Sequence, residues 1–580
     1  MLSPEAVLSP RVSAAIERAF GPGHAGADPV LRPSQYADVQ VNAALALAKE
    51  VGENPRAIAT RIVENLDLDD ICASVQVSGP GFINITLRDS WVALQTSALA
   101  ADPRLGVPTH TQQTVVIDYS APNVAKEMHV GHLRTTVVGD CLARVLDFLG
   151  HRVIRQNHIG DWGTPFGMLI EHLLDVGADS DEARFIETDP NSFYQAARAK
   201  FDSDEDFAAR ARARVVALQA NDPDTLKTWT RLVGLSRHYF NNIYRRLGVT
   251  LTDDDLAGES MYNADLPKVC EELIDQGIAV QSDGALCVFL DDYTGREGKL
   301  VPLIVRKSDG GYGYATTDLA TVRHRVRSLG ADRMLYVIGA PQALHLDMVW
   351  DTARLAGWLP EHVQPVHVRI GNVLGEDRKI LRTRSGAPLR LMALLDEAVA
   401  AARTVLDEQR ASLDEAVRAE VAPQVGMAAV KYADLSVAHD SEYVFDLTRM
   451  VAPTGNTGPY IQYAAARVRS IFRNAGLEPT DASVTEGSIT VTAPEERALC
   501  LQLLEFGPTV AGLDRNLEPH RLCAYLFSLA QAFSVFYEQC PVMKADTDEV
   551  RTSRLTLSAI TLRTLSAGLE LLGIESPERM

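Results

Sequence analysis

Residues 118–134 concentrate side chains that can do chemistry, above all His129 and His132 with Gly131 between them. Histidines at this spacing lie on one face of a helix, and both can donate hydrogen bonds to phosphate oxygens. Gly131 lets a large ligand approach the backbone. The same spacing also suits a helix cap or half of a metal site, but Lys126 adds a positive charge just upstream. The segment therefore predicts a nucleotide-phosphate site.

The elements around this segment form a βαβ unit. The apolar run at residues 114–119 predicts a buried strand, residues 131–149 predict a helix that Gly150 ends, and residues 152–156 predict a second strand. Such a unit implies a parallel sheet with a right-handed crossover. Ligands bind at the carboxyl ends of its strands, where the next helix offers free N–H groups and the positive end of its dipole to an anion.

The sheet resumes later in the chain. Strands are expected at residues 333–338 and 365–370, with helices at residues 318–329 and 345–356. An insertion at about residues 160–300 must therefore separate the two parts of the sheet.

The two ends of the chain have different patterns. Residues 1–110 mix helical periodicity with β-rich runs, which predicts a small N-terminal α+β domain. After residue 452, strand signals almost vanish and long apolar-periodic segments at residues 495–513, 520–539 and 552–572 predict an all-α helical bundle. The predicted fold class is α/β: a Rossmann-type parallel-sheet catalytic domain over residues 111–452, between the N-terminal domain and a C-terminal bundle over residues 453–580.

The composition limits the partners of the chain. Its 580 residues carry 56 Lys and Arg against 76 Asp and Glu, and this net charge of −20 argues against coating nucleic acid through bulk charge. A local basic face stays open, because Arg469, Arg554 and Arg563 lie among further positives near the C-terminal end; the alternative is a solvated helix face. Neither a long uncharged apolar run nor a signal peptide is present, so we expect a cytoplasmic protein without a membrane partner.

The cysteines argue against two further classes. All seven are scattered, and none forms a CxxC pair. A disulfide framework and a structural zinc ribbon are therefore unsupported, and we expect no structural metal.

Residues 129–132, His-Val-Gly-His, resemble the HIGH motif of class I aminoacyl-tRNA synthetases. Together with residues 120–126 and Arg134 they are similar to arginyl-tRNA synthetases in particular. Further segments match landmarks of that family over essentially the whole chain, at residues 36–42, 79–84, 157–163, 313–318, 336–339, 394–397, 457–460, 536–537 and 577–580.

The resemblance implies a class I fold and ATP-dependent ligation of L-arginine to the 3′ end of tRNA(Arg) through an arginyl-adenylate, for protein synthesis. ATP with Mg²⁺ is then the substrate complex, activation needs bound tRNA, and the chain acts as a monomer. Such a reaction needs little acid–base chemistry. Catalysis comes from positioning and from stabilising charge on the phosphates.

The resemblance assigns the phosphate end of the site to His129, His132 and Gly131, together with cations. The lysine-rich second motif of the class has its place at residues 381–385, where Arg384 stands for the second lysine and Arg382 lies nearby. The first lysine is absent, and Lys126 is the candidate that supplies its charge. The alternative for Arg382 and Arg384 is a surface loop whose charges meet only water.

The resemblance also implies acceptors for the substrate guanidinium, which has five donors and no acceptor. Tyr314 and Asp318 match the family's pair, and Glu259 matches a further carboxylate. On its own, Asp318 fits an ordinary carboxylate at a helix N-terminus. The positions that hold the substrate's α-amino end are matched by Asp118, Ser120, Asn123 and Gln342, although ordinary loop hydrogen bonds would also explain Ser120 and Gln342.

Four residues outside this site are candidates for tRNA contact. Asn84 belongs to the N-terminal domain, and Tyr460, Arg467 and Tyr537 belong to the helical bundle. Unpaired bases stack on aromatic rings and on arginine planes, which is why these residue types are chosen.

Other classes of function stay open. An adenylyl-transferring enzyme without tRNA would leave both terminal domains unexplained. A synthetase-like binding protein that has lost activation would explain the altered lysine loop, but His129, His132, Tyr314 and Asp318 argue against it. A sister specificity for cysteine would require a soft metal-ligand cluster, which no CxxC or CxxH spacing indicates.

Overall fold

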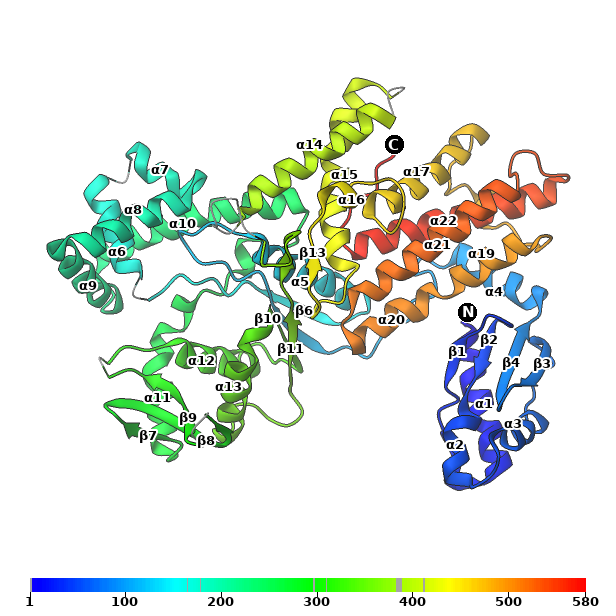
Figure 1. Cartoon of the computed structure of the whole chain (residues 1–580), viewed down its shortest axis with the longest axis horizontal. Coiled ribbons are helices and arrows are strands. Elements are labelled where there is room, and N and C mark those ends of the chain that lie inside the picture. The colour runs from blue at the N-terminus through cyan, green and yellow to red at the C-terminus, as the bar shows by residue number, and fades with distance from the viewer. Residues whose placement is uncertain are drawn as a thin grey trace.

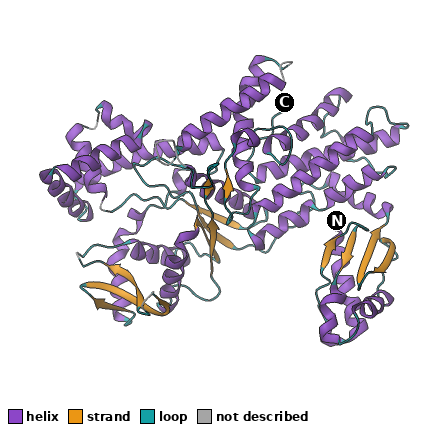
Figure 2. Cartoon of the chain, in the orientation of Figure 1, coloured by secondary structure: helices purple, strands orange, loops and turns teal. Residues whose placement is uncertain are grey.

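The computed structural model describes residues 3–163, 165–177, 179–295, 298–308, 310–381, 389–409 and 413–580. The molecule is elongated, with the N-terminal domain near one end of the long axis and a group of helices from the insertion at the other (Figure 1). The central sheet lies between them (Figure 2).

The central sheet has four parallel strands in the order β11-β10-β5-β6. Their bounds are β5 Thr114–Asp118, β6 Arg152–Gln156, β10 Arg333–Gly339 and β11 Gln364–Ile370. Helix α5, Val130–Phe148, connects β5 to β6, and α13, Ala343–Leu355, connects β10 to β11. The α/β fold predicted from the apolar runs is therefore confirmed. All four strands end at the same edge, which borders the histidine segment.

The insertion after β6 has two parts. The first is helical, with α6 Pro165–Val176, α7 Asp181–Thr188, α8 Pro190–Ser203, α9 Glu205–Gln219 and α10 Pro223–Leu247. The second carries an antiparallel sheet, with β7 Ala279–Ser282, β8 Ala285–Thr294 and β9 Leu300–Arg306, beside α11 Leu266–Asp275 and the 3₁₀ turns Asp253–Asp255 and Glu259–Asp265. Helix α12, Tyr314–Arg327, then returns the chain to the central sheet.

The N-terminal domain has an antiparallel sheet of order β1-β2-β4-β3 covered by helices. Its elements are α1 Pro4–Phe20, the 3₁₀ turn Pro22–His24, β1 Leu31–Pro33, β2 Val39–Val41, α2 Ala43–Val51, α3 Pro55–Glu64, β3 Cys72–Ser78, β4 Phe82–Leu87 and α4 Asp89–Ala101. Alternate residues of β4 are buried, as expected for a strand with one face on the core.

The C-terminal part is helical, as its periodicity predicts. Its elements are α14 Leu391–Gln409, α15 Glu415–Leu435, α16 Leu447–Met450, α17 Gly458–Ala475, α18 Ala482–Thr485, α19 Pro494–Leu504, α20 Phe506–Asn516, α21 Pro519–Gln539 and α22 Asp548–Leu571, with the short pair β12 Val373–Leu374 and β13 Tyr443–Val444. The single segment expected at residues 495–513 is two helices. Pro508 has no N–H for the carbonyl of Leu504, which ends α19 there.

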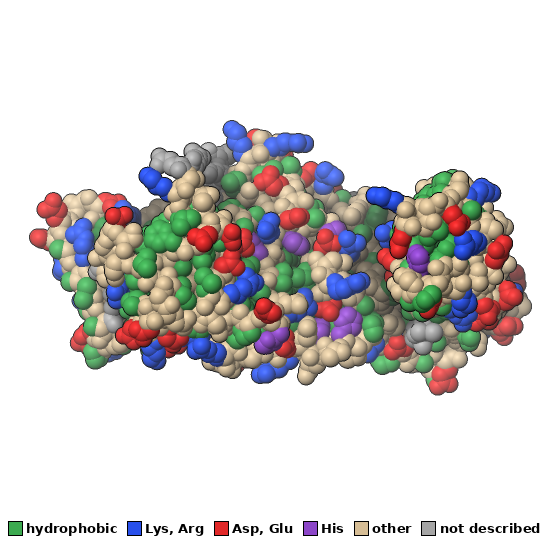
Figure 3. Space-filling view, turned by 90° about the horizontal axis from the view of Figure 1, so that it is seen from below, with side chains coloured by type: hydrophobic (Ala, Val, Ile, Leu, Met, Phe, Trp, Pro, Cys, Tyr) green, Lys and Arg blue, Asp and Glu red, His purple; other side chains and the backbone are tan. Residues whose placement is uncertain are grey.

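Several charged side chains hold these parts together instead of facing solvent. Arg563 donates to the carbonyls of Ala100 and Asp102, and Arg554 pairs with buried Glu496 at 2.7 Å. Arg469 donates to the C-terminal segment at Ser576. The basic face considered from the sequence is thus partly an internal network. On the face drawn in Figure 3, basic and acidic side chains are interspersed.

A buried ion pair joins α5 to α15. Arg134 Nε lies 2.6 Å from Asp434 Oδ1, and the two side chains are 1% and 0% exposed. Arg134 also donates to the carbonyl of Ser441 at 2.7 Å, and its guanidinium lies over the ring of Tyr443. Within the described part of the chain, no helix is both long enough and apolar enough to span a membrane.

The buried pair leads to a prediction about stability. Asp434→Asn keeps the shape but leaves the Arg134 guanidinium buried without its counter-charge, which should cost about 3–5 kcal/mol of unfolding free energy. The measurement is urea denaturation followed by circular dichroism. Glu415→Gln, which breaks an exposed pair with Arg403 on the neighbouring surface, is the control and should hardly move the transition. Equal shifts for both variants would contradict the prediction.

Candidate functional site

A pocket of about 850 Å³ opens at the carboxyl edge of the central sheet. It is bordered by the ends of β5, β10 and β11 and by the first turns of α5 and α12. Eight residues singled out from the sequence line it: Asp118, Ser120, His129, Gly131, His132, Tyr314, Asp318 and Gln342. The fold thus brings together segments that are more than two hundred residues apart, as a parallel sheet does at a common strand edge.

The two histidines cap helix α5 reciprocally. His129 is the N-cap and its Nδ1 accepts the N–H of Gly131 at 3.0 Å, while His132 Nδ1 accepts the N–H of His129 at 3.1 Å. Because each Nδ1 is an acceptor, each ring carries its proton on Nε2, which leaves both Nε2–H groups as donors. The hydrogen-bond network, rather than observed protons, assigns these tautomers.

Burial keeps both rings neutral. It lowers the pKa of His132 to about 3 and also lowers the pKa of His129. The histidines therefore offer directional donors and no formal charge. Gly131 serves them in a way that the spacing did not predict: a Cβ there would lie 2.8 Å from His129 Cε1, so a side chain would displace the ring.

The cations expected at the phosphate end of the site, beside the histidines, lie elsewhere or outside the described residues. Arg382 and Arg384 belong to residues 382–388, which the structure does not describe. Lys126 is not part of the pocket lining as far as it is described, and its Nζ lies 4.7 Å from the ring centre of Tyr194 on α8. The ring attracts the ammonium in this arrangement, and the expectation that Lys126 faces the phosphates stays a prediction.

The part of the pocket around Asp318, called the acidic end below, carries the residues expected to bind a guanidinium. Tyr314 and Asp318 lie one turn apart at the start of α12, and Asp318 Oδ2 is 2.6 Å from His345 Nε2 on α13. Hydrogen bonding to Asp318 raises the pKa of His345. The sequence interpretation missed His345, whose only signal was its position just after Gln342.

Glu259 stands close behind this acidic end without lining the described pocket. Burial, with the nearby carboxylates of Asp161 and Asp318, raises the pKa of Glu259 to about 8. A cation placed between Glu259 and Asp318 would restore the ionised form of Glu259. The arrangement therefore favours a positively charged ligand group.

The residues expected to hold the substrate's α-amino end differ in whether their polar atoms are already paired. Asp118 lines the pocket, but its Oδ2 accepts from the fully buried Arg325 at 2.6 Å, so its charge is already paired. Its Oδ1 is buried and has no hydrogen-bond partner among the described residues. Ser120 is held by Tyr244 at 2.7 Å within an internal network.

Gln342 and Asn123, also expected at the α-amino end, differ in their access to the pocket. Gln342 ends the 3₁₀ turn Ala340–Gln342 and faces the pocket. Asn123 is exposed, forms a bridge with Gly160 and is absent from the described lining. The sequence thus gave no means to separate Asn123 from Gln342, because both are polar loop residues near strand ends.

The four candidates for tRNA contact lie outside the described pocket lining. On β4, Asn84 Oδ1 accepts from Gln40, and its amide donates to Ser78. In the helical bundle, the Arg467 guanidinium lies over the rings of Tyr463 and Tyr537, 5.3 and 5.4 Å from their centres. The ring of Tyr460 packs on Phe527.

Comparison with known proteins covers all three parts of the chain. Residues 95–447 match the family "tRNA synthetases class I (R), catalytic domain", residues 461–580 match the "DALR anticodon binding domain", and residues 6–87 match the "Arginyl tRNA synthetase N terminal domain". The chain is 66% identical to an arginine–tRNA ligase of Thermobifida fusca, with 100% of both chains covered. It is 46% identical to one of Vibrio vulnificus, over 99% of this chain and 100% of the relative.

The chain belongs to the arginyl-tRNA synthetase family. A solved arginyl-tRNA synthetase of Plasmodium falciparum has 28% identity and a TM-score of 0.83, and 100% of both chains is covered. The Thermus thermophilus synthetase has 23% identity and a TM-score of 0.81 with the same coverage, which supports the fold of this synthetase.

One side-chain group of the synthetase has the spacing of a metal site. His110, His151 and Asp514 place their ligand atoms within 4.8 Å of one another. However, His151 Nδ1 accepts the N–H of Gln113, so its Nε2 carries the proton, and Asp514 already pairs with Arg333 at 2.6 Å. Metal binding at His151 would require that proton to leave. The group is better explained as an ion-pair joint between the sheet and α20.

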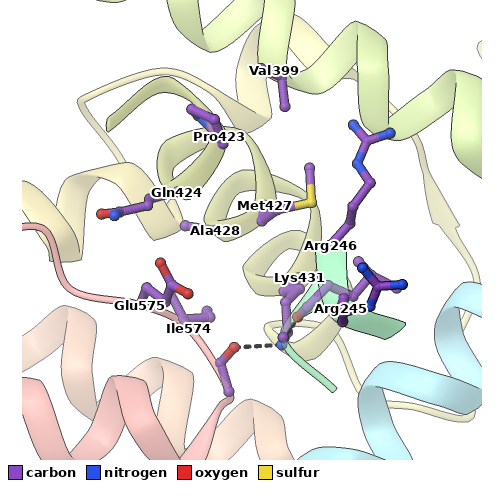
Figure 4. A pocket seen from close by; sticks show the side chains of 13 residues that line it. Arg245, Arg246, Val399, Pro423, Gln424, Met427, Ala428, Lys431, Ile574 and Glu575 are labelled. Atoms are coloured by element: carbon purple, nitrogen blue, oxygen red, sulfur yellow. Dashed lines mark hydrogen bonds between the residues drawn. The ribbon is translucent and has the colours of Figure 1, made fainter. Parts of the chain in front are cut away.

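A second cavity, of about 360 Å³, lies between α10, α14, α15 and the C-terminal segment (Figure 4). Buried Lys431 stands at its base, and burial lowers the pKa of Lys431 to about 8. Its Nζ donates to the carbonyls of Leu247, at 2.6 Å, and Gly573. The charge of Lys431 is therefore used to hold α10 and the C-terminal segment on α15.

The contact between Asp318 and His345 leads to a pH prediction. Because the pKa of His345 is raised, its cationic form persists to higher pH, and it is lost as the pH rises. That cation competes with a guanidinium for Asp318, so the KM for arginine should fall as the pH rises from about 6 to about 8.

A matched variant isolates this effect. His345→Gln can still donate to Asp318 but does not titrate, so the ratio of KM at pH 6 to KM at pH 8 should be at least about threefold smaller than in the wild type. Glu259, the other nearby group that titrates here, is present in both proteins. An unchanged ratio in steady-state aminoacylation would contradict the assignment.

Proposed function

We propose that this synthetase ligates L-arginine to the 3′ end of tRNA(Arg) in two steps. The arginine carboxylate attacks the α-phosphate of ATP, forming arginyl-adenylate and releasing pyrophosphate. A hydroxyl of the terminal ribose of tRNA then attacks the carbonyl carbon and releases AMP. The observation that carries the proposal is a single pocket whose lining combines neutral imidazole donors and a helix N-terminus with the carboxylate of Asp318.

The phosphate end of the proposed site consists of His129, Gly131 and His132. The two Nε2–H groups and the first turn of α5 would stabilise charge that develops on the α-phosphate. We assign the remaining cations to Lys126, Arg382 and Arg384, with Mg²⁺ accompanying ATP as part of the substrate. Lys126 must leave the ring of Tyr194 to take this part.

The acidic end of the proposed site receives the arginine side chain. Asp318 and Glu259 would accept from the guanidinium, and Tyr314 would cover it. The proposed contacts of the α-amino end are Asp118, Ser120, Asn123 and Gln342. The free Oδ1 of Asp118 and the pocket position of Gln342 support these two more than the others.

We assign tRNA binding to all three parts of the chain, with domains over residues 1–110, 111–452 and 453–580. Asn84 would contact a tRNA loop from the N-terminal domain, and Tyr460, Arg467 and Tyr537 would contact the anticodon. Arg467 supports this best, because its guanidinium lies near the rings of Tyr463 and Tyr537, and unpaired bases stack on arginine planes and aromatic rings. We also propose that the synthetase works as a monomer in the cytoplasm.

The assignment of Asp318 gives a direct test. Asp318→Ala removes an acceptor from a charged donor, so kcat/KM for arginine should fall at least about 10²-fold while ATP binding hardly changes. Steady-state aminoacylation and ATP titration measure the two effects. Asp181→Ala on α7 removes a carboxylate that is 93% exposed and should leave kcat/KM unchanged. A wild-type KM for arginine in Asp318→Ala would remove Asp318 from the proposed site.

A further prediction concerns the need for tRNA. If Lys126 and the cations of residues 382–388 must converge on ATP, bound tRNA can supply the differential binding energy for that change. Arginine-dependent ATP–pyrophosphate exchange should be near background without tRNA and appear when tRNA(Arg) is added.

The same assay tests the anticodon contact. Arg467→Ala should need about tenfold more tRNA for half-maximal exchange, because one stacking contact is worth roughly 1–3 kcal/mol. The KM for arginine at saturating tRNA should not change.

The tRNA requirement itself has a clear contradicting outcome. Strong arginine-dependent exchange by RNA-free wild-type protein would favour a tRNA-independent adenylating enzyme instead.

A further inference from the structure

Glu127 is a buried carboxylate two residues before His129, and the proposed reaction does not use it. It is 7% exposed, and burial raises its pKa. Its Oε2 lies 2.9 Å from Arg390 Nε and accepts from Asn191 Nδ2 at 2.8 Å. A negative charge this close to a polyphosphate site is unfavourable unless it has a structural use there.

Arg390, the ion-pair partner of Glu127, belongs to the segment that follows residues 382–388. There, the N–H of Val130 donates to the carbonyl of Leu389 at 3.2 Å, and the N–H of Leu391 donates to the carbonyl of Met128 at 2.9 Å. Leu389 itself lines the pocket. The ion pair therefore reinforces a backbone bridge between His129 and Arg390, so that this segment and the start of α5 form one rigid wall.

Helix α8 also contacts both Glu127 and Arg390. Its N-cap, Asp189, accepts from Arg390 Nη2 at 3.2 Å, and Asn191 in its first turn forms a two-way contact with Glu127, accepting from the backbone N–H at 3.4 Å. One turn later, the Tyr194 ring lies below the Lys126 ammonium. Residues 126 and 127 are thus held at both side chains by α8.

We propose that Glu127 is a positioning residue for adenylate formation. By holding Arg390 and Asn191 together, it fixes the backbone that presents His129 and Lys126 between α8 and residues 389–391. This inference rests on the proposed function, since it assigns Glu127 to the ATP-dependent step of that reaction. Its charge acts through Arg390, and Glu127 is not among the described residues that line the pocket.

The test uses the full-length chain with Glu127→Gln, which keeps the size of the side chain and its acceptor for Asn191 but removes the buried one of the two carboxylates that pair with Arg390 and leaves Asp189. We expect arginine-dependent ATP–pyrophosphate exchange, with saturating tRNA, to fall at least about tenfold in kcat. The KM for arginine should stay within about twofold, because the acidic end of the pocket is untouched. Transfer of arginine from synthetic arginyl-adenylate to tRNA should keep its wild-type rate.

A double-mutant cycle tests the route through Arg390. If Glu127 acts by placing Arg390, then Glu127→Gln combined with Arg390→Gln should be no slower than the more damaging single variant. Glu415→Gln, which breaks an exposed pair with Arg403, serves as the control and should leave both half-reactions at the wild-type rate.

The outcomes separate this inference from the proposed function. Exchange by Glu127→Gln within about threefold of the wild type would overturn the positioning role, and so would an equal loss in both half-reactions accompanied by a lower unfolding midpoint. Additive effects of Glu127→Gln and Arg390→Gln would overturn the route through Arg390. Absence of arginine-dependent exchange in the wild type with tRNA present would instead overturn the proposed function.

Discussion

The ion pair between Arg134 and Asp434 is the constraint on which the arrangement of the synthetase depends. Arg134 lies in the second turn of α5, the helix whose first turn forms the phosphate end of the proposed site. Its guanidinium is entirely inside the protein, where removing a charge from water is tolerated only if its donors are satisfied. Asp434 and the carbonyls of Ser441 and Ala438 provide those acceptors. Any rotation of α15 must therefore be transmitted to the helix that carries the histidines.

The pocket divides its work between two kinds of polar group. At one end, His129 and His132 are locked in the tautomer that donates from Nε2, because their other nitrogens cap the helix. Behind the acidic end, burial, together with the nearby carboxylates of Asp161 and Asp318, raises the pKa of Glu259 to about 8. Preorganised donors need no rearrangement when charge develops, and crowded acids gain most when a cation enters. The two ends thus select for a ligand that is anionic at one end and cationic at the other.

The sequence predicted the elements of the fold well where burial has a simple pattern. Residues 114–119 were predicted as a buried strand and form β5, where Val115, Val116 and Ile117 are all buried, since an inner parallel strand is covered on both faces. The sequence was a poorer guide where a residue's partner comes from a distant segment. Asp118 ends a strand as a ligand-binding residue should, yet Arg325 takes one of its oxygens, and no spacing near Asp118 announces that contact. His345 was missed for the same reason: its place in the site depends on its contact with Asp318 of α12.

The order of strands in the central sheet has a consequence for synthesis of the chain. Strand β5 pairs with β6 soon after both are made, but its other neighbour is β10, and the contact of Thr114 with Asp332 spans 218 residues. At about 5–20 residues per second, the ribosome leaves that edge of β5 without its partner for about 10–40 s. An open apolar edge invites pairing with other chains. The insertion, whose helices and hairpins make local contacts, can fold during this interval, before β10 is available to pair with β5. Nascent chains of this synthetase should therefore depend on chaperones most strongly while the residues between β6 and β10 are being synthesised.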